Sequence, residues 1–373
     1  MRARIVMVAA FALVAGCMHP RAIQAPEQVH LTPLKTISTL QARVLLGLSG
    51  VKGISVHNAI DCYRLEYFDG NAARLSGLLA LPRGVVPRTL VSFQHGTTTT
   101  RGAVPSRPDG TGLAAAILFA GNGYALVVPD YPGLGESPGR HPYYVADSIG
   151  PAVVAMIEAA QRLEAVPDGA VFLTGFSEGG WASLAALRLL ESQGKDVLGS
   201  AQVAGAYDLR RVSLPAALKG GALSHSLYLA YAAWGQAAYY GHPLDSVLTP
   251  EYATTVERLF AGAPPKEILS TLPPQPRTMF NQAFLDAFDR DEPHWYLDAF
   301  AANSLVDVTP RAPLRLYYGS RDLDVVPEEA LAAARSMSAR GADVKAVDVG
   351  PVAHEPSMLA AAPLILAWLR ELD

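Results

Sequence analysis

Residues 175–180 read Gly-Phe-Ser-Glu-Gly-Gly, and this serine set among glycines is the clearest chemical signal in the 373-residue chain. Residues 170–174, just before it, read as a short buried strand, and an apolar helical stretch follows it. A strand that turns sharply into a helix holds the serine in a strained backbone conformation, with its oxygen clear of the sheet. The pattern therefore predicts that Ser177 is a nucleophile.

A serine hydroxyl is a poor nucleophile at neutral pH, so it needs a neighbouring base that a carboxylate orients. Among the nine histidines, His354 alone lies in a loop between a late strand and the closing helix. Two carboxylates, Asp322 and Asp324, follow the strand expected at 314–318. We predict His354 as the base and Asp322 as the acid. Asp324 is the alternative acid; otherwise it caps the helix that starts near Pro327, because aspartate is favoured at helix starts.

Attack on a carbonyl group builds negative charge on the carbonyl oxygen, which needs preorganised N–H donors. One expected donor is the backbone N–H of Glu178, the residue after the serine. The other is expected in the loop after the strand at 90–93, where either Gly96 or Thr97 is a candidate. His95, in the same loop, is expected to shape the loop rather than to transfer protons.

The elements that must position these loops are short apolar strands that alternate with helices. Such alternation predicts an α/β fold, with a mostly parallel sheet covered by helices on both faces, over residues 59–208 and 312–373. Strands are expected at 62–68, 74–81, 90–93, 124–128, 170–174, 201–206, 314–318 and 344–349, and helices at 113–120, 151–163, 181–190, 327–337 and 356–372.

Residues 209–311 interrupt the alternation and show no strand pattern. We predict that they form a helical cap folded over one end of the sheet; the alternative is a separate helical domain without contact to the site. Apolar side chains of such a cap suit an apolar substrate. The candidate pocket residues are Tyr131, Tyr228, Tyr231 and Trp234.

From about residue 61 to the end, without the insertion, the chain resembles the α/β-hydrolase superfamily. Within it, the chain looks like a secreted bacterial lipase or esterase with a helical cap. Residues 130–137, Asp-Tyr-Pro-Gly-Leu-Gly-Glu-Ser, are similar to the family's Asp-x-x-Gly-x-Gly-x-Ser turn, which is structural in most members, so Asp130 receives no catalytic role. One departure concerns the acid: members usually carry one aspartate at a fixed spacing before Val-Pro, and here Asp322 and Asp324 straddle that spacing.

The resemblance implies a Ser-His-Asp triad that cleaves carboxylic esters through an acyl-enzyme, without a cofactor. An alternative with the same triad is a serine peptidase of the prolyl-peptidase-like type. Such peptidases usually carry an amino-terminal propeller, for which this chain has no room. A third hypothesis, a non-catalytic binding lipoprotein, expects a broken triad.

Residues 1–17 read as a signal peptide, with Arg2 and Arg4 before an apolar run that is too short to span a bilayer. The run ends in Val-Ala-Gly-Cys, which resembles a bacterial lipobox, so Cys17 is the predicted lipidation site. The alternative is a secretory signal in which Cys17 is incidental. Residues 18–58 are expected to form a tether, with one short helix near 40–48. The expected location is the outer membrane of a Gram-negative bacterium, through a lipid anchor.

Composition excludes several other functions. A net charge of −4 and a pI of about 6.1 leave no basic face for nucleic acid. The sequence has no His-Glu-x-x-His motif, no cysteine pair and no phosphate-binding glycine loop of the P-loop type. We therefore expect neither a metal nor a cofactor.

Overall fold

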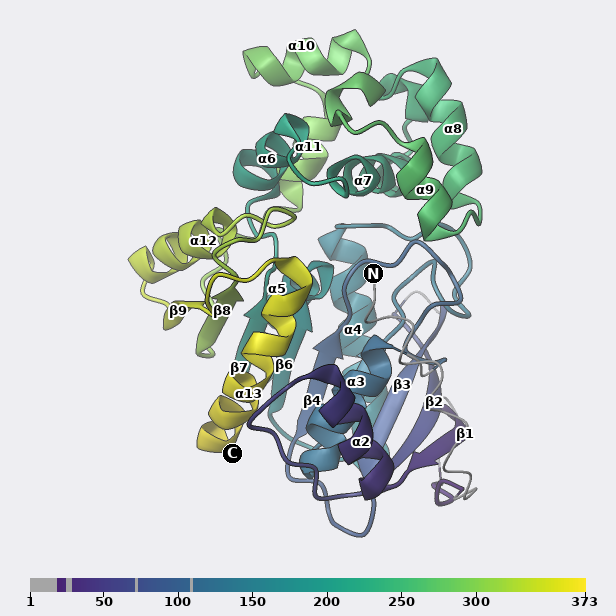
Figure 1. Cartoon of the computed structure of the whole chain (residues 1–373), viewed down its shortest axis with the longest axis vertical. Coiled ribbons are helices and arrows are strands. Elements are labelled where there is room, and N and C mark those ends of the chain that lie inside the picture. The colour runs from purple at the N-terminus through teal and green to yellow at the C-terminus, as the bar shows by residue number, and fades with distance from the viewer. Residues whose placement is uncertain (1–18, 25–28, 71–72, 108–109) are drawn as a thin grey trace.

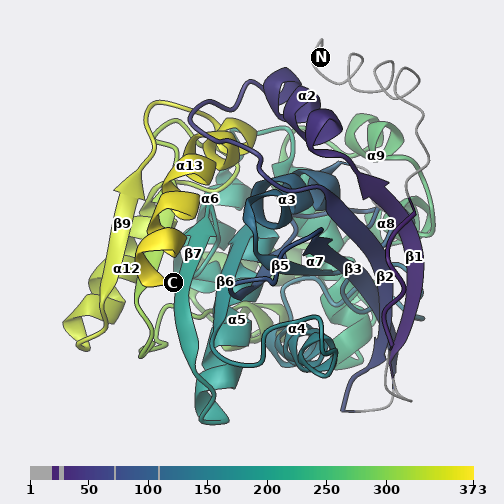
Figure 2. The ribbon, with the colours of Figure 1, turned by 90° about the horizontal axis from the view of Figure 1, so that it is seen from below.

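The structure is a computed structural model, and it describes residues 19–24, 29–70, 73–107 and 110–373. Its centre is one nine-stranded sheet with the order β1-β2-β3-β5-β4-β6-β7-β8-β9 (Figures 1 and 2). Strands β1, β2, β3 and β5 pair antiparallel in turn, and all pairs from β5 through β4 to β9 are parallel. The strands are β1 His30–Ile37, β2 Ile60–Phe68, β3 Arg74–Pro82, β4 Leu90–Gln94, β5 Ala125–Pro129, β6 Val171–Phe176, β7 Val197–Val203, β8 Leu314–Tyr318 and β9 Val344–Asp348.

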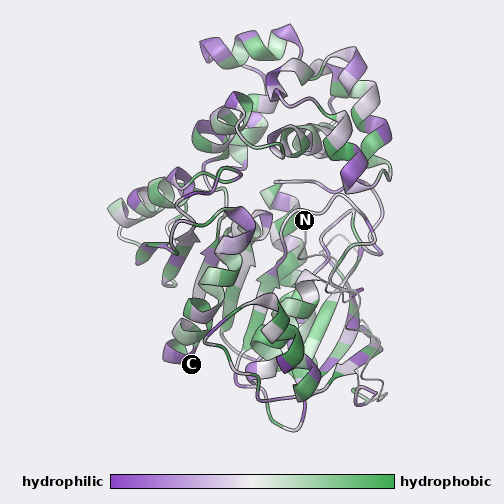
Figure 3. Ribbon diagram, in the orientation of Figure 1, coloured by the Kyte–Doolittle hydropathy of each residue, from purple (hydrophilic) through white to green (hydrophobic). Residues whose placement is uncertain are grey.

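Helices cover both faces of this sheet, and each face has its own apolar cluster. One cluster lies under α2 (Thr39–Ser49), α3 (Thr111–Phe119) and α13 (His354–Leu372). The other lies under α4 (Ala146–Gln161), α5 (Glu178–Ser192) and α12 (Glu328–Ala339). Figure 3 shows the strands between them coloured mostly as hydrophobic, as expected for strands buried on two faces. The predicted α/β fold with helices on both faces is confirmed.

The segment between β7 and β8 is helical, and its described residues contain only one isolated bridge, Leu248 to Phe280. Figure 1 shows its helices as a layer beyond the end of the sheet at which β6 gives way to α5. We call this layer the cap. It consists of η3 Leu209–Ser213, α6 Leu214–Lys219, α7 His225–Tyr240, η4 Leu244–Ser246, α8 Pro250–Phe260, α9 Pro265–Thr271, η5 Pro276–Met279, α10 Gln282–Arg290 and α11 Trp295–Ala302.

The expectation of a tether over residues 18–58 is wrong for most of that segment. Strand β1 pairs antiparallel with β2 and extends the sheet, with a register shift between Pro33 and Lys35. The expected short helix is α2, which begins with a capping box between Ser38 and Gln41. An edge strand is held by main-chain hydrogen bonds and leaves much of its surface exposed, so β1 shows little apolar alternation.

The signal peptide and Cys17 lie outside the described residues. In the part of the chain that is described, no helix has both the length and the apolar content needed to cross a bilayer.

Candidate functional site

Ser177 occupies the turn between β6 and α5, with φ 58° and ψ −122°. Few residues other than glycine adopt such a positive φ. The neighbouring glycines are required by close backbone approaches. A Cβ on Gly175 would lie 2.2 Å from the carbonyl oxygen of Gly179, and one on Gly179 would lie 2.0 Å from that of Gln94. The predicted strand–turn–helix geometry around the serine is therefore present.

Two side chains from segments far from Ser177 in the sequence complete a hydrogen-bonded chain with it. His354 Nε2 lies 2.9 Å from Ser177 Oγ, and His354 Nδ1 lies 2.7 Å from Asp322 Oδ2. All three side chains are buried. His354 is the first residue of α13 rather than part of the preceding loop, and Asp322 follows β8. The other oxygen of Asp322 accepts the backbone N–H groups of Asp324 and Val325, which fixes the carboxylate.

The hydrogen-bond partner of Asp324 fits neither of the two roles considered for it, the catalytic acid and the helix cap. Its Oδ1 accepts the hydroxyl of Ser224, at the start of the cap helix α7. Helix α12 begins after Pro327 without a side-chain cap, so the expectation that Asp324 caps this helix is wrong. The hydrogen bond from Ser224 draws Asp324 toward the cap, whereas Asp322 faces His354.

The predicted oxyanion donors border the serine. Glu178 is the first residue of α5, and the first N–H groups of a helix have no partner inside it. A Cβ on Gly96 would lie 3.5 Å from the Cβ of Ser177, so the loop after β4 passes directly beside the serine. Thr97 places its hydroxyl 2.8 Å from that of Tyr143.

His95 and Tyr131 shape this loop. His95 Nδ1 lies 2.7 Å from the carbonyl oxygen of Gly96, and the Tyr131 hydroxyl donates to the carbonyl oxygen of His95 at 3.0 Å. Tyr131 is thus a support of the loop and not a residue of the pocket wall. Asp130 has the structural role that the resemblance implies: it accepts the Ser76 hydroxyl and the Ser106 N–H at 2.6 and 2.8 Å, and burial raises the pKa of its carboxyl.

Sequence reasoning missed a buried pair next to the nucleophile. Glu178 Oε1 lies 2.7 Å from His141 Nε2, and both side chains are about 1% exposed. His141 Nδ1 lies 2.9 Å from the carbonyl oxygen of Pro132, so both ring nitrogens of His141 contact hydrogen-bond acceptors. The only signal in the sequence is a glutamate at the start of a mostly apolar helix.

A small cavity of about 60 Å³, here called the Ser177 cavity, lies between the core and the cap. Tyr228, Leu229 and Ala232 of α7 line it, so the cap contacts the site and is not a separate domain. Tyr228 is the one proposed pocket residue in this lining. Tyr231 and Trp234 stack on each other instead, and they bond to the carbonyl oxygen of Thr98 and to Glu257.

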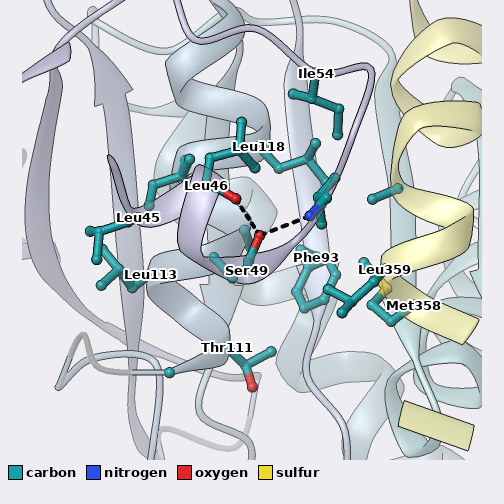
Figure 4. A pocket seen from close by; sticks show the side chains of 16 residues that line it. Leu45, Leu46, Ser49, Ile54, Phe93, Thr111, Leu113, Leu118, Met358 and Leu359 are labelled. Carbon is teal, nitrogen blue, oxygen red and sulfur yellow. Dashed lines mark hydrogen bonds between the residues drawn. The ribbon is translucent and has the colours of Figure 1, made fainter. Parts of the chain in front are cut away.

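A second cavity, of about 110 Å³, lies among α2, α3 and α13 and is shown in Figure 4. Its lining is almost wholly apolar, with Leu46, Phe93 and Leu118 among its side chains, and it contains no titratable group among the described residues.

The described residues contain no group of three or more His, Cys, Asp or Glu side chains that could hold a metal ion.

The fold is shared with solved structures of hydrolases. A provisionally assigned hydrolase from Legionella pneumophila matches with a TM-score of 0.85 and 25% identity, over 93% of this chain and 98% of that one. The rice cell wall degrading esterase LipA from Xanthomonas oryzae matches with a TM-score of 0.79 and 24% identity, over 92% and 96%. Candida antarctica lipase A in its closed state matches with a TM-score of 0.63 and 14% identity, over 92% and 83%. No protein-family model and no curated protein sequence matches.

Proposed function

We propose that this protein is a serine hydrolase that cleaves carboxylic esters. The observation that carries the proposal is the hydrogen-bonded chain from Ser177 through His354 to Asp322, with distances of 2.9 and 2.7 Å, in which Ser177 lines a cavity under the cap. An esterase and a lipase among the solved structures with this fold support the same chemistry. A fold alone hosts many functions, so the proposal rests on the geometry of the site.

The reaction follows from the positions of these groups. His354 Nε2 accepts the hydroxyl proton as Ser177 Oγ attacks the carbonyl carbon of the ester. The negative charge that forms on the carbonyl oxygen is stabilised by the Glu178 N–H and by an N–H of Gly96 or Thr97. As the tetrahedral intermediate collapses, the leaving alkoxide takes the proton from His354. Water then attacks the acyl-enzyme, with His354 again as the base. As the second tetrahedral intermediate collapses, the bond between the acyl carbon and Ser177 Oγ breaks, the serine oxygen takes the proton from His354, and the carboxylic acid leaves.

The test is Ser177→Ala. We expect the variant to fold, to hydrolyse no p-nitrophenyl ester and to take no label from a fluorophosphonate probe, because the attacking oxygen is gone. Ser270→Ala, at an exposed position of α9, is the control and should be labelled like the wild type. Undiminished labelling of folded Ser177→Ala would refute the proposal. Turnover of aminopeptidase substrates without turnover of esters would favour the peptidase alternative.

We also propose that the protein is an outer-membrane lipoprotein anchored through Cys17. This proposal rests on the lipobox-like end of the apolar run at residues 5–14. Acyl chains on such a cysteine anchor a protein without spanning the bilayer.

A further inference from the structure

The Ser177 cavity has an apolar wall and a polar side. Leu209, Leu229, Phe300 and Val325 are among the apolar side chains of the lining. Ser213, His225 and Asp324 are also in the lining, and none of them belongs to the proposed catalytic groups. A polar group in a mostly apolar cavity fixes what the cavity binds, because a buried polar group without a partner is costly.

His225 offers a hydrogen-bond acceptor. Its side chain is only 3% exposed, and its Nε2 lies 2.8 Å from the carbonyl oxygen of Leu323. A carbonyl oxygen can only accept, so Nε2 carries a proton, which leaves Nδ1 as the ring nitrogen that can accept a hydrogen bond. This buried Nδ1 has no hydrogen-bond partner among the described residues.

Asp324 and Ser213 add further acceptors. Asp324 accepts the Ser224 hydroxyl with Oδ1, and no hydrogen bond to its Oδ2 is found within the described parts of the chain. Ser213 donates its hydroxyl proton to Glu329, so its oxygen can only accept from a bound molecule. A ligand that satisfies this side of the cavity must therefore bring a hydrogen-bond donor.

The volume of the Ser177 cavity and its mostly apolar lining limit which hydrogen-bond donor can bind there. The cavity measures about 60 Å³. A cavity of about 150 Å³ can hold benzene, so this smaller cavity takes only a short group. A hydroxyl group satisfies the acceptors at a smaller desolvation cost than an ammonium group, which would bring a full charge into a mostly apolar lining.

We propose that the Ser177 cavity recognises a short ester group that carries a hydroxyl, with Asp324 and His225 as the residues that accept its hydrogen bond. This substrate class rests on the proposed ester hydrolysis at Ser177. Asp324 is then a specificity residue, two positions beyond the residue that orients His354.

The experiment compares initial rates of acid release from ethyl butyrate with those from ethyl 2-hydroxybutyrate, ethyl 3-hydroxybutyrate and 2-hydroxyethyl butyrate. The first two hydroxy esters place the hydroxyl in the acyl group, and the third places it in the alcohol. We expect at least one of the three to exceed its unsubstituted counterpart about 10- to 100-fold in kcat/KM, the range that one hydrogen bond to a charged group provides.

Asp324→Ala and His225→Phe should each lower this ratio toward one, and Asp324→Asn, the mildest change, should lower it part of the way. A purely structural role would instead lower the rates for both members of a pair equally. The matched control is Asp298→Asn, at an exposed position of α11, which should keep the wild-type ratio.

The outcomes separate this inference from the proposed function. Ser177-dependent hydrolysis of ethyl butyrate with ratios near one for all three hydroxy esters overturns the inference and leaves the function standing. A preference that survives in both variants overturns the assignment to these residues. A stronger preference for ethyl 3-aminobutyrate overturns the hydroxyl in favour of an ammonium group. A wild-type protein that hydrolyses none of these esters and takes no fluorophosphonate label refutes the proposed function itself.

Discussion

Asp322 and Asp324 lie only two positions apart, but their carboxylate oxygens contact different groups. Asp322 contacts His354 at 2.7 Å and accepts two backbone N–H groups, so the position of its carboxylate is fixed. Asp324 faces Ser224 of the cap. An acid that orients an imidazole holds the correct tautomer and stabilises the imidazolium. Only Asp322 meets that requirement.

We therefore expect Asp322→Asn to lower kcat by on the order of 10⁴, as the equivalent change does in a well-studied triad. The asparagine keeps the shape of the side chain, so the melting temperature should change little. Steady-state kinetics on p-nitrophenyl butyrate measure the effect, and Asp298→Asn serves as the control. If Asp322→Asn keeps more than a tenth of the wild-type kcat, the acid has been assigned wrongly.

At the scale of elements, the site depends on contacts between segments far apart in sequence. The loop between β5 and α4 carries His141, which contacts Glu178 of α5. The same loop touches the cap: a Cβ on Gly235 of α7 would lie 2.4 Å from the carbonyl oxygen of His141. The pair thus joins the first turn of α5, where an oxyanion donor is expected, to the loop beneath the cap.

Removing either member of this pair should be costly, because the other is left buried without its partner. We expect His141→Gln and Glu178→Gln each to lower the free energy of unfolding by about 3–5 kcal/mol. The double variant should lose less than the sum, with a coupling of at least about 1 kcal/mol. Urea unfolding measures all three variants. Arg188→Gln breaks the exposed pair with Asp147 and should cost under about 1 kcal/mol. Additive losses would show that the two side chains act independently.

At the scale of the whole molecule, Glu329 of α12 attaches the start of the cap to the core. Its Oε2 accepts the N–H groups of Tyr207 and Asp208 at 2.6 and 2.8 Å, and its Oε1 accepts the hydroxyl of Ser213. Burial raises the pKa of this carboxyl from 4.5 to about 7, although these hydrogen bonds act in the opposite direction. The native state therefore holds this proton more tightly than the unfolded chain does.

The raised pKa predicts a pH dependence with a definite sign. The contribution of Glu329 to stability is fully present below about pH 4.5 and is lost as the pH rises through about 7. The difference corresponds to about 3 kcal/mol. We expect the free energy of unfolding of the wild type, minus that of Glu329→Gln, to fall by this order between pH 4.5 and 8. Glu328→Gln, at the exposed neighbouring position, should show no such trend. A difference that stays constant with pH would contradict the raised pKa.

The attachment of the whole molecule to a membrane is a separate prediction. Cys17→Ser should stop incorporation of labelled palmitate and move the protein from the membrane fraction to the soluble fraction, because acylation needs the thiol. Cys62→Ser is the control, since Cys62 is the only other cysteine, and it should still incorporate palmitate. A wild-type protein that takes up no palmitate and fractionates as soluble would remove the lipoprotein proposal.

The sequence by itself determined the features that depend on local order. The turn at Ser177 could be predicted because strand, glycines and helix are contiguous. Asp322 and His354 could be placed because each follows a recognisable strand and parallel strands end at the same edge of a sheet. The α/β class followed from the alternation of short strands and helices, and it is confirmed by the sheet and by its likeness to solved structures.

Only the tertiary structure decided the features that depend on contacts between segments far apart in the sequence. Strand β1 is held by main-chain bonds to β2, which leave little trace in its side chains. Glu178 and His141 are 37 positions apart, and nothing in the sequence around either residue indicates that the two are in contact. Helix α7 is apolar around much of its circumference, so its sequence could not show which residues face the cavity. The packing of the cap turns Tyr228 toward that cavity and leaves Trp234 on Tyr231 and Phe260.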